Sequence, residues 1–352
     1  MSVAKEEYIS PKDNNFLLGH KEAESVFLNA WKNSSLHNSV LICGEKGIGK
    51  ATLAYKIIKF LLTADESNKD KYQNIDSDPN NPIVCQIEEG ACYNLKVIER
   101  DYVEEDKKKI IKAIKDGNPL DEEELAGLRK SAVIKIDEVR TINEFMAKTS
   151  YDNNWRIVLI DSIDDMNVNS ANALLKILEE PPEKSILLLI SHQPNKLLAT
   201  IRSRCIKLHL QPLSKENIGV LLRRYMPTLN EQDIQQLSSI SGGSIRKALK
   251  YASNNGLQIY HNLQEILFKG SSFRLSKACE MADLVSSDDD IWQLTIELIL
   301  QLCADMIKSG EKGEAFLDCY QMVLQSTRDV TALNMDKKHA FFKIIHGVTT
   351  VL

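Results

Sequence analysis

Residues 39–50, with the sequence SVLICGEKGIGK, decide the fold. Positions 39–43 are mostly apolar and include valine and isoleucine, which predicts a buried strand. Residues 44–50 fit the pattern G-x-x-x-x-G-K, and apolar residues at helical spacing follow at positions 53, 57, 58 and 61. A strand, a glycine-rich turn and a helix in this order are the context of a phosphate-binding loop. The stretch therefore predicts nucleotide-site ancestry in preference to a plain glycine-rich turn.

The turn contains the groups that hold phosphate in such loops. Gly44, Gly47 and Gly49 let the backbone turn tightly and aim its N–H groups at phosphate oxygens, and the helix N-terminus adds partial positive charge. Lys50 would place a cation beside the β and γ phosphates. These four residues are the first nucleotide-binding candidates.

The residue after the loop departs from the pattern. Ala51 stands where a serine or threonine hydroxyl would hold Mg²⁺, and a methyl group cannot coordinate a metal. Thr52 follows and remains a nucleotide-binding candidate, but one step along a helix turns a side chain by about 100°. Thr52 would therefore not simply replace the missing ligand, and we expect ATP or ADP to bind with weak or absent Mg²⁺ coordination.

A second nucleotide motif should be an apolar strand that ends in an acidic residue. Residues 157–160 are apolar and lead into Asp161, which we expect beside the phosphate loop, where it would bind a metal through water. Ser162 stands where hydrolysing enzymes have a glutamate, and its hydroxyl is too weak a base to activate water. Asp164 and Asp165 are expected to point elsewhere on the turn. The missing groups favour a site that binds nucleotide weakly or serves as a scaffold.

Composition is that of a globular protein. Of the 352 residues, 43% are hydrophobic and 26% charged, which excludes a collagenous, disordered or membrane-spanning chain. The polar N-terminus argues against a secretory signal, and seven scattered cysteines indicate reduced thiols. A net charge of −5 argues against binding nucleic acid by bulk charge. We expect a cytoplasmic protein.

The order of the patterns predicts an α/β protein with helical domains behind it. Apolar strand patterns at 39–43, 157–160 and 186–190 are separated by helical patterns, which is typical of a parallel sheet. After about residue 211 only helical patterns remain, with a linker-like cluster at 253–256. The predicted domains are an α/β domain at 1–210, a small helical domain at 211–253 and a second helical domain at 257–352. Within the first, we expect a polar loop or disordered insertion at 63–82 and, at 101–130, a charged insertion of solvated helices rather than a docking site.

Further motifs carry a family resemblance. Residues 172–182 read NALLKILEEPP, residues 198–205 read LATIRSRC, and residues 136–140 read IDEVR. This succession resembles bacterial clamp-loader subunits of the AAA+ superfamily, above all the delta prime (δ′) subunits of DNA polymerase III, from about residue 18 to about residue 252. The resemblance implies an AAA+ P-loop NTPase domain, a helical lid and an all-α collar for oligomerisation. The last hundred residues are similar only in length and helicity.

The resemblance also implies roles for individual residues. Within S-R-C, Arg204 would be an arginine finger presented to ATP on the neighbouring subunit. Its guanidinium suits that role because it is always charged and can fork onto phosphate oxygens; a surface salt bridge is the alternative. Arg246, in a segment similar to the second sensor motif, would face the phosphates of its own chain. Ser191 and His192 occupy the place of the first sensor, although His192 could simply cap the strand.

The same resemblance raises two further questions: whether the chain binds zinc, and which residues would contact DNA. Many relatives have four cysteines between the two nucleotide motifs, but here only Cys85 and Cys92 lie in that interval. A closed structural zinc site needs four ligands, so we expect no zinc and no other structural metal. The ring of subunits in this family encloses primed DNA through backbone contacts, and the sequence singles out no residue for that contact.

The implied function is that of a δ′ subunit, which helps the clamp-loader complex of the DNA polymerase III holoenzyme, a DNA-directed DNA polymerase, to load the sliding clamp during replication. The implied partners are the other subunits of a hetero-oligomeric ring (tau/gamma and delta), the clamp and primed DNA. Hydrolysis of ATP by this chain itself is not expected. The alternatives are an autonomous ATPase of tau/gamma type, which would need a hydroxyl at position 51 and a glutamate at 162, and a P-loop nucleotide kinase, which would need an arginine-rich lid.

Overall fold

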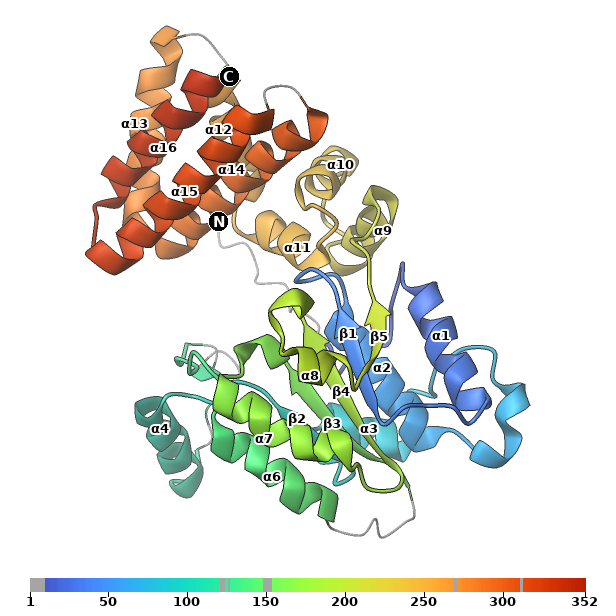
Figure 1. Ribbon diagram of the computed structural model, residues 1–352. Coiled ribbons are helices and arrows are strands. Elements are labelled where there is room, and N and C mark those ends of the chain that lie inside the picture. The colour runs from blue at the N-terminus through green and yellow to red at the C-terminus, as the bar shows by residue number, and fades with distance from the viewer. Residues whose placement is uncertain are drawn as a thin grey trace. The chain divides into compact units, whose positions relative to one another are not determined.

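The computed structural model describes residues 10–118, 120, 124–125, 127–147, 154–268, 271–310 and 313–352. They form two compact units that divide between Pro212 and Leu213, and Figure 1 draws both. Residues 1–9, and residues 119, 121–123 and 126 of the predicted charged insertion, lie outside the described residues.

The first unit contains a parallel sheet of five strands. In spatial order these are β2 (Leu95–Ile98), β3 (Arg156–Asp161), β4 (Ser185–Ser191), β1 (Ser39–Cys43) and β5 (Ile206–His209). Every neighbouring pair is parallel, which confirms the predicted α/β class. The register pairs Cys43 with Ser191 and Asp161 with Ile190. The carboxyl ends of the three central strands therefore meet at one edge, where ligands bind in open α/β sheets.

Helices cover both faces of this sheet (Figure 1). One face packs against α1 (Lys21–Lys32), α2 (Lys50–Thr63) and α3 (Pro82–Glu88), and the other against α6 (Ile136–Ala147) and α7 (Val168–Glu179). Successive residues of a strand point to opposite faces. Val40 and Ile42 accordingly join the core of α1 and α2, while Leu41 and Cys43 join the core of α6 and α7. Burial on both sides explains why these strands are almost wholly apolar.

Short elements connect the strands and helices of the first unit. They are η1 (Glu66–Lys71), α4 (Glu104–Lys115), η2 (Ile163–Asp165), η3 (Pro194–Lys196) and α8 (Ala199–Arg202). The polar segment at 63–82 contains η1 and is anchored by Ile75, which is fully buried. In the charged segment α4 is held by ion pairs, among them Lys107 with Asp101 and Lys135 with Glu104 (2.7 Å).

The second unit is helical throughout its described residues. It contains α9 (Lys215–Tyr225), α10 (Glu231–Ile240), α11 (Ile245–Ser253), α12 (Gly256–Phe268), α13 (Ser271–Ser287), α14 (Asp289–Ser309), α15 (Gly313–Leu333) and α16 (Lys337–Val351). The helices α9, α10 and α11 pack on one another, and α14, α15 and α16 pack in sequence. In the part of the chain that the structure describes, no helix combines the length and the apolar character that crossing a bilayer requires.

Candidate functional site

The phosphate loop joins β1 to α2 in a conformation that needs glycine. Gly44 has a φ of +148°, and a Cβ atom there would lie 2.5 Å from the carbonyl oxygen of Leu210 and 2.8 Å from the Ile48 side chain. Leu210 lies so close because its N–H donates to the Cys43 carbonyl (2.8 Å) as the chain leaves β5. Gly47 and Gly49 also have positive φ, +81° and +106°. The loop therefore has the left-handed and open backbone that only glycine adopts readily.

Lys50 lies inside this loop. Its Nζ donates to the carbonyl oxygens of Gly44 (2.7 Å) and Glu45, and only 3% of the residue is exposed. Burial lowers the pKa of Lys50 from 10.5 to about 8, although the carboxylates of Asp161 and Asp164 act in the opposite direction. The cation is thus fixed at the centre of the loop, at the position from which it could meet a phosphate.

Asp164 connects the carboxyl ends of β3 and β4. One carboxylate oxygen accepts from the Ser191 hydroxyl (2.9 Å) and the Gln193 N–H (3.2 Å), and the other from the Ser162 hydroxyl (2.8 Å) and the His192 N–H (2.6 Å). Burial works to raise the pKa of Asp164, but these hydrogen bonds outweigh it and the pKa is lowered. Asp164 is therefore ionised and links the ends of β3 and β4, at the edge of the sheet where the phosphate loop lies.

The structure corrects one expectation about this turn. Asp164 was expected to point away from the site, which is wrong, because η2 turns the side chain back toward the end of β4. Asp165 does face away and forms an ion pair with Arg100 (3.2 Å). Asp161 remains at the carboxyl end of β3. The hydroxyl hydrogens of both Ser162 and Ser191 go to Asp164, so neither serine acts as a base here.

His20 belongs to the site although the sequence analysis did not include it. It precedes the first residue of α1, is 4% exposed, and has its Nε2 2.6 Å from the carbonyl oxygen of Ile48. Burial lowers the pKa of His20, and the nearby charge of Lys50 adds to the effect, whereas the contact with Ile48 and the charge of Glu24 oppose it. The neutral ring therefore donates to the loop. The sequence feature that could have pointed to His20 is the Gly19-His20 pair directly before an amphipathic helix.

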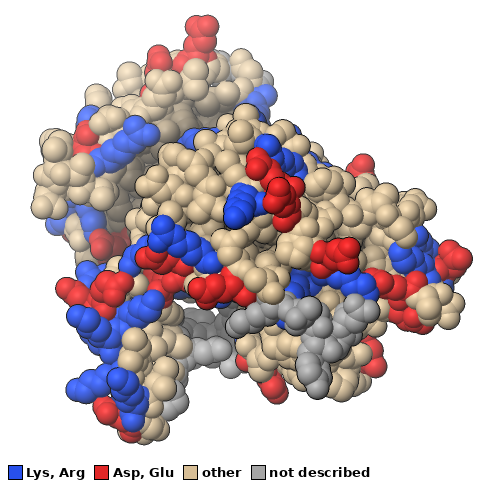
Figure 2. All heavy atoms as spheres, turned by 60° about the horizontal axis from the view of Figure 1, so that its bottom comes forward, with Lys and Arg blue, Asp and Glu red and all other residues tan. Residues whose placement is uncertain are grey.

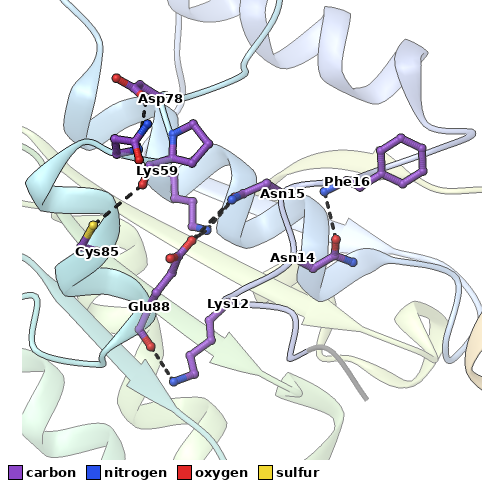
Figure 3. Close-up of polar contacts among 10 residues, drawn as sticks. Lys12, Asn14, Asn15, Phe16, Lys59, Asp78, Cys85 and Glu88 are labelled. Carbon is purple, nitrogen blue, oxygen red and sulfur yellow. Dashed lines mark hydrogen bonds and ion pairs between the residues drawn. The ribbon is translucent and has the colours of Figure 1, made fainter. Parts of the chain in front are cut away.

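A polar cluster around the buried Lys59 holds the segment that leads to His20 (Figure 3). Lys59 of α2 donates to the Asn15 side chain (2.7 Å) and to the Glu88 carboxylate of α3 (2.6 Å). Lys12 donates to the main-chain carbonyl of Glu88 (2.6 Å). The N-terminal segment is thus fastened to α2 and α3 before it reaches the loop, where Leu17 packs against Gly49.

A cavity of about 640 Å³ borders this segment, between α1, α2 and residues 73–79. The cation of Lys56 in its wall pairs with Glu24 (2.7 Å) and Asp76 (2.8 Å). Lys59, also in the wall, is engaged by Glu88. The charged groups of the wall largely neutralise one another, so the phosphate loop remains the better place for an anion.

Arg204 lies just after α8, and its guanidinium has two partners. Its Nη2 is 2.7 Å from the Glu179 carboxylate at the end of α7, and its Nη1 donates to the Thr200 carbonyl (3.0 Å). The side chain is 35% exposed. Arg204 therefore takes part in an intrachain ion pair and is still accessible from outside.

Two further candidates lie elsewhere. Arg246 belongs to the second unit, where it occupies the first turn of α11 and is exposed. Ser244 caps this helix, and its hydroxyl accepts from the Lys247 N–H (3.3 Å). The loop, Asp161, Ser191 and His192 come together within the first unit, and Arg246 is a residue of the second.

The two cysteines between the nucleotide motifs, Cys85 and Cys92, differ in their surroundings. Cys85 is exposed and contacts the Pro79 carbonyl at 3.8 Å, whereas Cys92 is buried. Among the described residues, no three His, Cys, Asp or Glu side chains gather in a way that could hold a metal. Cys43 packs in the core of the sheet, where burial raises its pKa to about 11.

Surface charge is mixed rather than segregated. Figure 2 shows basic and acidic side chains interspersed over the face that it draws. This is consistent with the net charge of −5, and it favours local over bulk contacts with any polyanion.

Comparison with known proteins gives a consistent set of relatives. The family model described as DNA polymerase III, delta subunit, matches residues 19–214, which is more than half of the chain. The delta prime subunit of Pseudomonas aeruginosa is 42% identical over 112 residues, which cover 32% of this chain and 34% of that protein. The gamma subunit of Buchnera aphidicola is 27% identical over 249 residues, which cover 68% of this chain and 57% of that protein. The matches thus span about a third and just over half of these relatives.

A solved gamma subunit-related protein of Thermotoga maritima covers 92% of this chain and 99% of its own at 18% identity, with a TM-score of 0.39. The phosphate loop on a parallel sheet and the match over residues 19–214 agree with the resemblance drawn from the sequence. The chain belongs to the family described as DNA polymerase III, delta subunit, and so to the AAA+ clamp-loader proteins.

Proposed function

We propose that this chain is a δ′-type subunit of a DNA polymerase III clamp loader, with a degraded nucleotide site of its own and an arginine finger, Arg204, for the ATP of a neighbouring subunit. The proposed partners are tau/gamma and delta subunits in a hetero-oligomeric ring, with the sliding clamp and primed DNA bound through the assembly. The chain would be a component of a DNA-directed DNA polymerase without being its catalytic subunit.

One observation carries the proposal: a well-formed phosphate loop stands beside Ser162, which occupies the position after Asp161 where hydrolysing relatives have a glutamate to activate water. Ser162 follows Asp161 and gives its hydroxyl hydrogen to Asp164. Asp164 is itself a poor base, because four hydrogen bonds stabilise its ionised form. A general base works best when its pKa lies near the working pH, and the pKa of Asp164 is lowered away from it.

The loop fits phosphate better than it fits a metal. The buried Lys50 cation and the main-chain N–H groups of residues 44–50 suit an ATP or ADP phosphate tail. Ala51 offers no hydroxyl to Mg²⁺, and Thr52 is nearly buried on the next face of α2. We therefore propose that nucleotide, when bound, is held through Lys50 and the backbone with weak metal coordination.

Arg204 has the properties that a finger needs. It lies between α8 and β5, has a guanidinium that is always charged and keeps part of its surface accessible. In other phosphoryl-transfer systems such an arginine changes the rate by about 10³–10⁵. The match of Ser203 and Cys205 to the family motif supports the same role.

The test measures ATP turnover of the assembly that this chain forms with its partner subunits. Arg204→Ala should leave the chain folded and able to co-purify with them but slow turnover severalfold. Arg223→Ala is the matched control, because Arg223 is an exposed arginine in a similar ion pair, 2.6 Å from Glu231. If Arg204→Ala behaves like Arg223→Ala, Arg204 is only a surface salt bridge and the proposal is wrong.

An autonomous ATPase of tau/gamma type is the second candidate, because the identity to a gamma subunit extends over 68% of this chain. Ala51 and Ser162 argue against it. Purified chain that hydrolyses ATP by itself at more than about one turnover per second, an ordinary enzyme rate, would favour this candidate.

A further inference from the structure

The Arg204 guanidinium is held by an anionic site within its own chain. The Nη2 to Oε1 distance to Glu179 is 2.7 Å, and the second contact goes to a neutral carbonyl at Thr200. Glu179 is the last residue of α7, and Glu180 caps that helix. The carboxylate therefore lies at the end of a helix where the backbone dipole is negative.

This arrangement is electrostatically unusual for Glu179 but favourable for Arg204. A carboxylate at a helix C-terminus is unfavourable, whereas a cation there is stabilised. The Glu179 carboxylate, at the C-terminus of α7, presents the guanidinium with negative charge, as a phosphate group would. In the free chain the guanidinium therefore pairs with the negative charge of Glu179, whereas in the assembly it would pair with a phosphate.

We infer that Glu179 is a competitor for the arginine finger: it holds Arg204 within the chain until the triphosphate on the neighbouring subunit displaces it. This inference rests on the proposed function, because it requires Arg204 to be a finger. The Glu179 side chain is 50% exposed, and an exposed ion pair shifts an equilibrium by no more than about fivefold. A bias of that size is small, so the ion pair can open and re-form in each cycle.

Glu179→Gln tests the inference, since it removes the charge and keeps the shape. In the assembled complex at low salt it should raise ATP turnover about two- to fivefold. The gain should shrink as salt rises, because salt screens exposed pairs in the unaltered protein. A merely structural role of Glu179 would not produce this dependence on salt.

Glu180→Gln is the matched control. It is exposed, forms no ion pair within the described ranges, and removes the same charge one residue away. The inference is overturned if Glu179→Gln and Glu180→Gln give equal turnover at low salt, or if Glu179→Gln slows turnover, since the carboxylate would then help to orient the finger.

Arg204→Ala in the same assay distinguishes a failure of the proposed arginine finger from a failure of the competition by Glu179. Normal turnover with Arg204→Ala overturns the finger, and this inference with it. Slow turnover with Arg204→Ala, together with no gain from Glu179→Gln, overturns this inference alone. The double variant should be as slow as Arg204→Ala, because Glu179 acts only through that arginine.

Discussion

Asp164 determines the geometry of the two strand ends that border the phosphate loop. Its two oxygens accept hydrogen bonds from two hydroxyls and two main-chain N–H groups, at residues 162 and 191–193. The ionised form is required, because a neutral acid would replace an acceptor by a donor. Asp164 thus fixes the strand ends beside the loop, while the neighbouring Ser162 cannot act as the base that activates water.

Asp164→Asn should lower the free energy of unfolding by about 1.5–3 kcal/mol at neutral pH, the range for hydrogen bonds to a charged group. The pKa of Asp164 is lowered from its ordinary 3.8, so its contribution is full above that pH and lost as the pH falls through the folded-state pKa. The difference between variant and unaltered protein should therefore shrink below about pH 3.8. Urea unfolding at several pH values measures it.

Asp165→Asn is the control for that measurement. Its carboxylate pairs with the part-exposed Arg100 (3.2 Å), and such pairs contribute about 0–1 kcal/mol. An Asp164→Asn effect as small as that of Asp165→Asn would contradict the role given to Asp164.

For single residues, the sequence predicted roles that depend on a few neighbouring positions. It did not predict contacts between residues far apart in the chain. The glycines of the loop and Lys50 follow from a seven-residue pattern. Three of the four partners of Asp164 lie 27 to 29 residues away, and His20 contacts Ile48 across 28 residues. No periodicity in the sequence encodes those contacts, because they depend on the way the strands line up in the sheet.

Among the elements, β1, β5 and the phosphate loop are joined at Gly44. The Leu210 N–H bonds to Cys43 beside the position where a Gly44 side chain would be. The close approach is to backbone, which cannot move without breaking the link to β5. The loop and the edge strand therefore constrain each other.

Gly44→Ala should lower the free energy of unfolding by about 2–5 kcal/mol, combining roughly 1–2 for a positive φ with about 1–3 for overpacking. Gly90→Ala provides the comparison, because Gly90 has a φ of +72° with open space around it. It should cost only about 1–2 kcal/mol. Urea unfolding followed by tryptophan fluorescence compares the two, and equal losses would mean that contact with Leu210 is unimportant.

The sequence predicted the central strands and missed the edges for a physical reason. β1, β3 and β4 are covered on both faces and are read as apolar runs. β2 and β5 have four residues each and are partly exposed, with lysines at positions 96 and 207. Charged residues on edge strands discourage pairing with other chains, and the same charges conceal the strands from a search for apolar runs.

At the scale of the whole molecule, two cations of this chain should differ in their effect on ATP turnover. Lys50 is in the chain's own loop and Arg204 is on its surface. If the chain contributes chemistry only to its neighbour, the surface cation matters to turnover and the loop cation does not. An autonomous enzyme would have the opposite order.

Lys50→Ala and Arg204→Ala, each in the reconstituted assembly, decide between these orders. We expect turnover with Lys50→Ala to stay within about twofold of normal, because the site already lacks a metal ligand and a base, while Arg204→Ala slows it severalfold. Co-purification with the partner subunits checks that both variants assemble. Collapse of turnover or clamp loading with Lys50→Ala would mean that nucleotide in this chain's own loop is needed, and that the missing groups at positions 51 and 162 do not disable it.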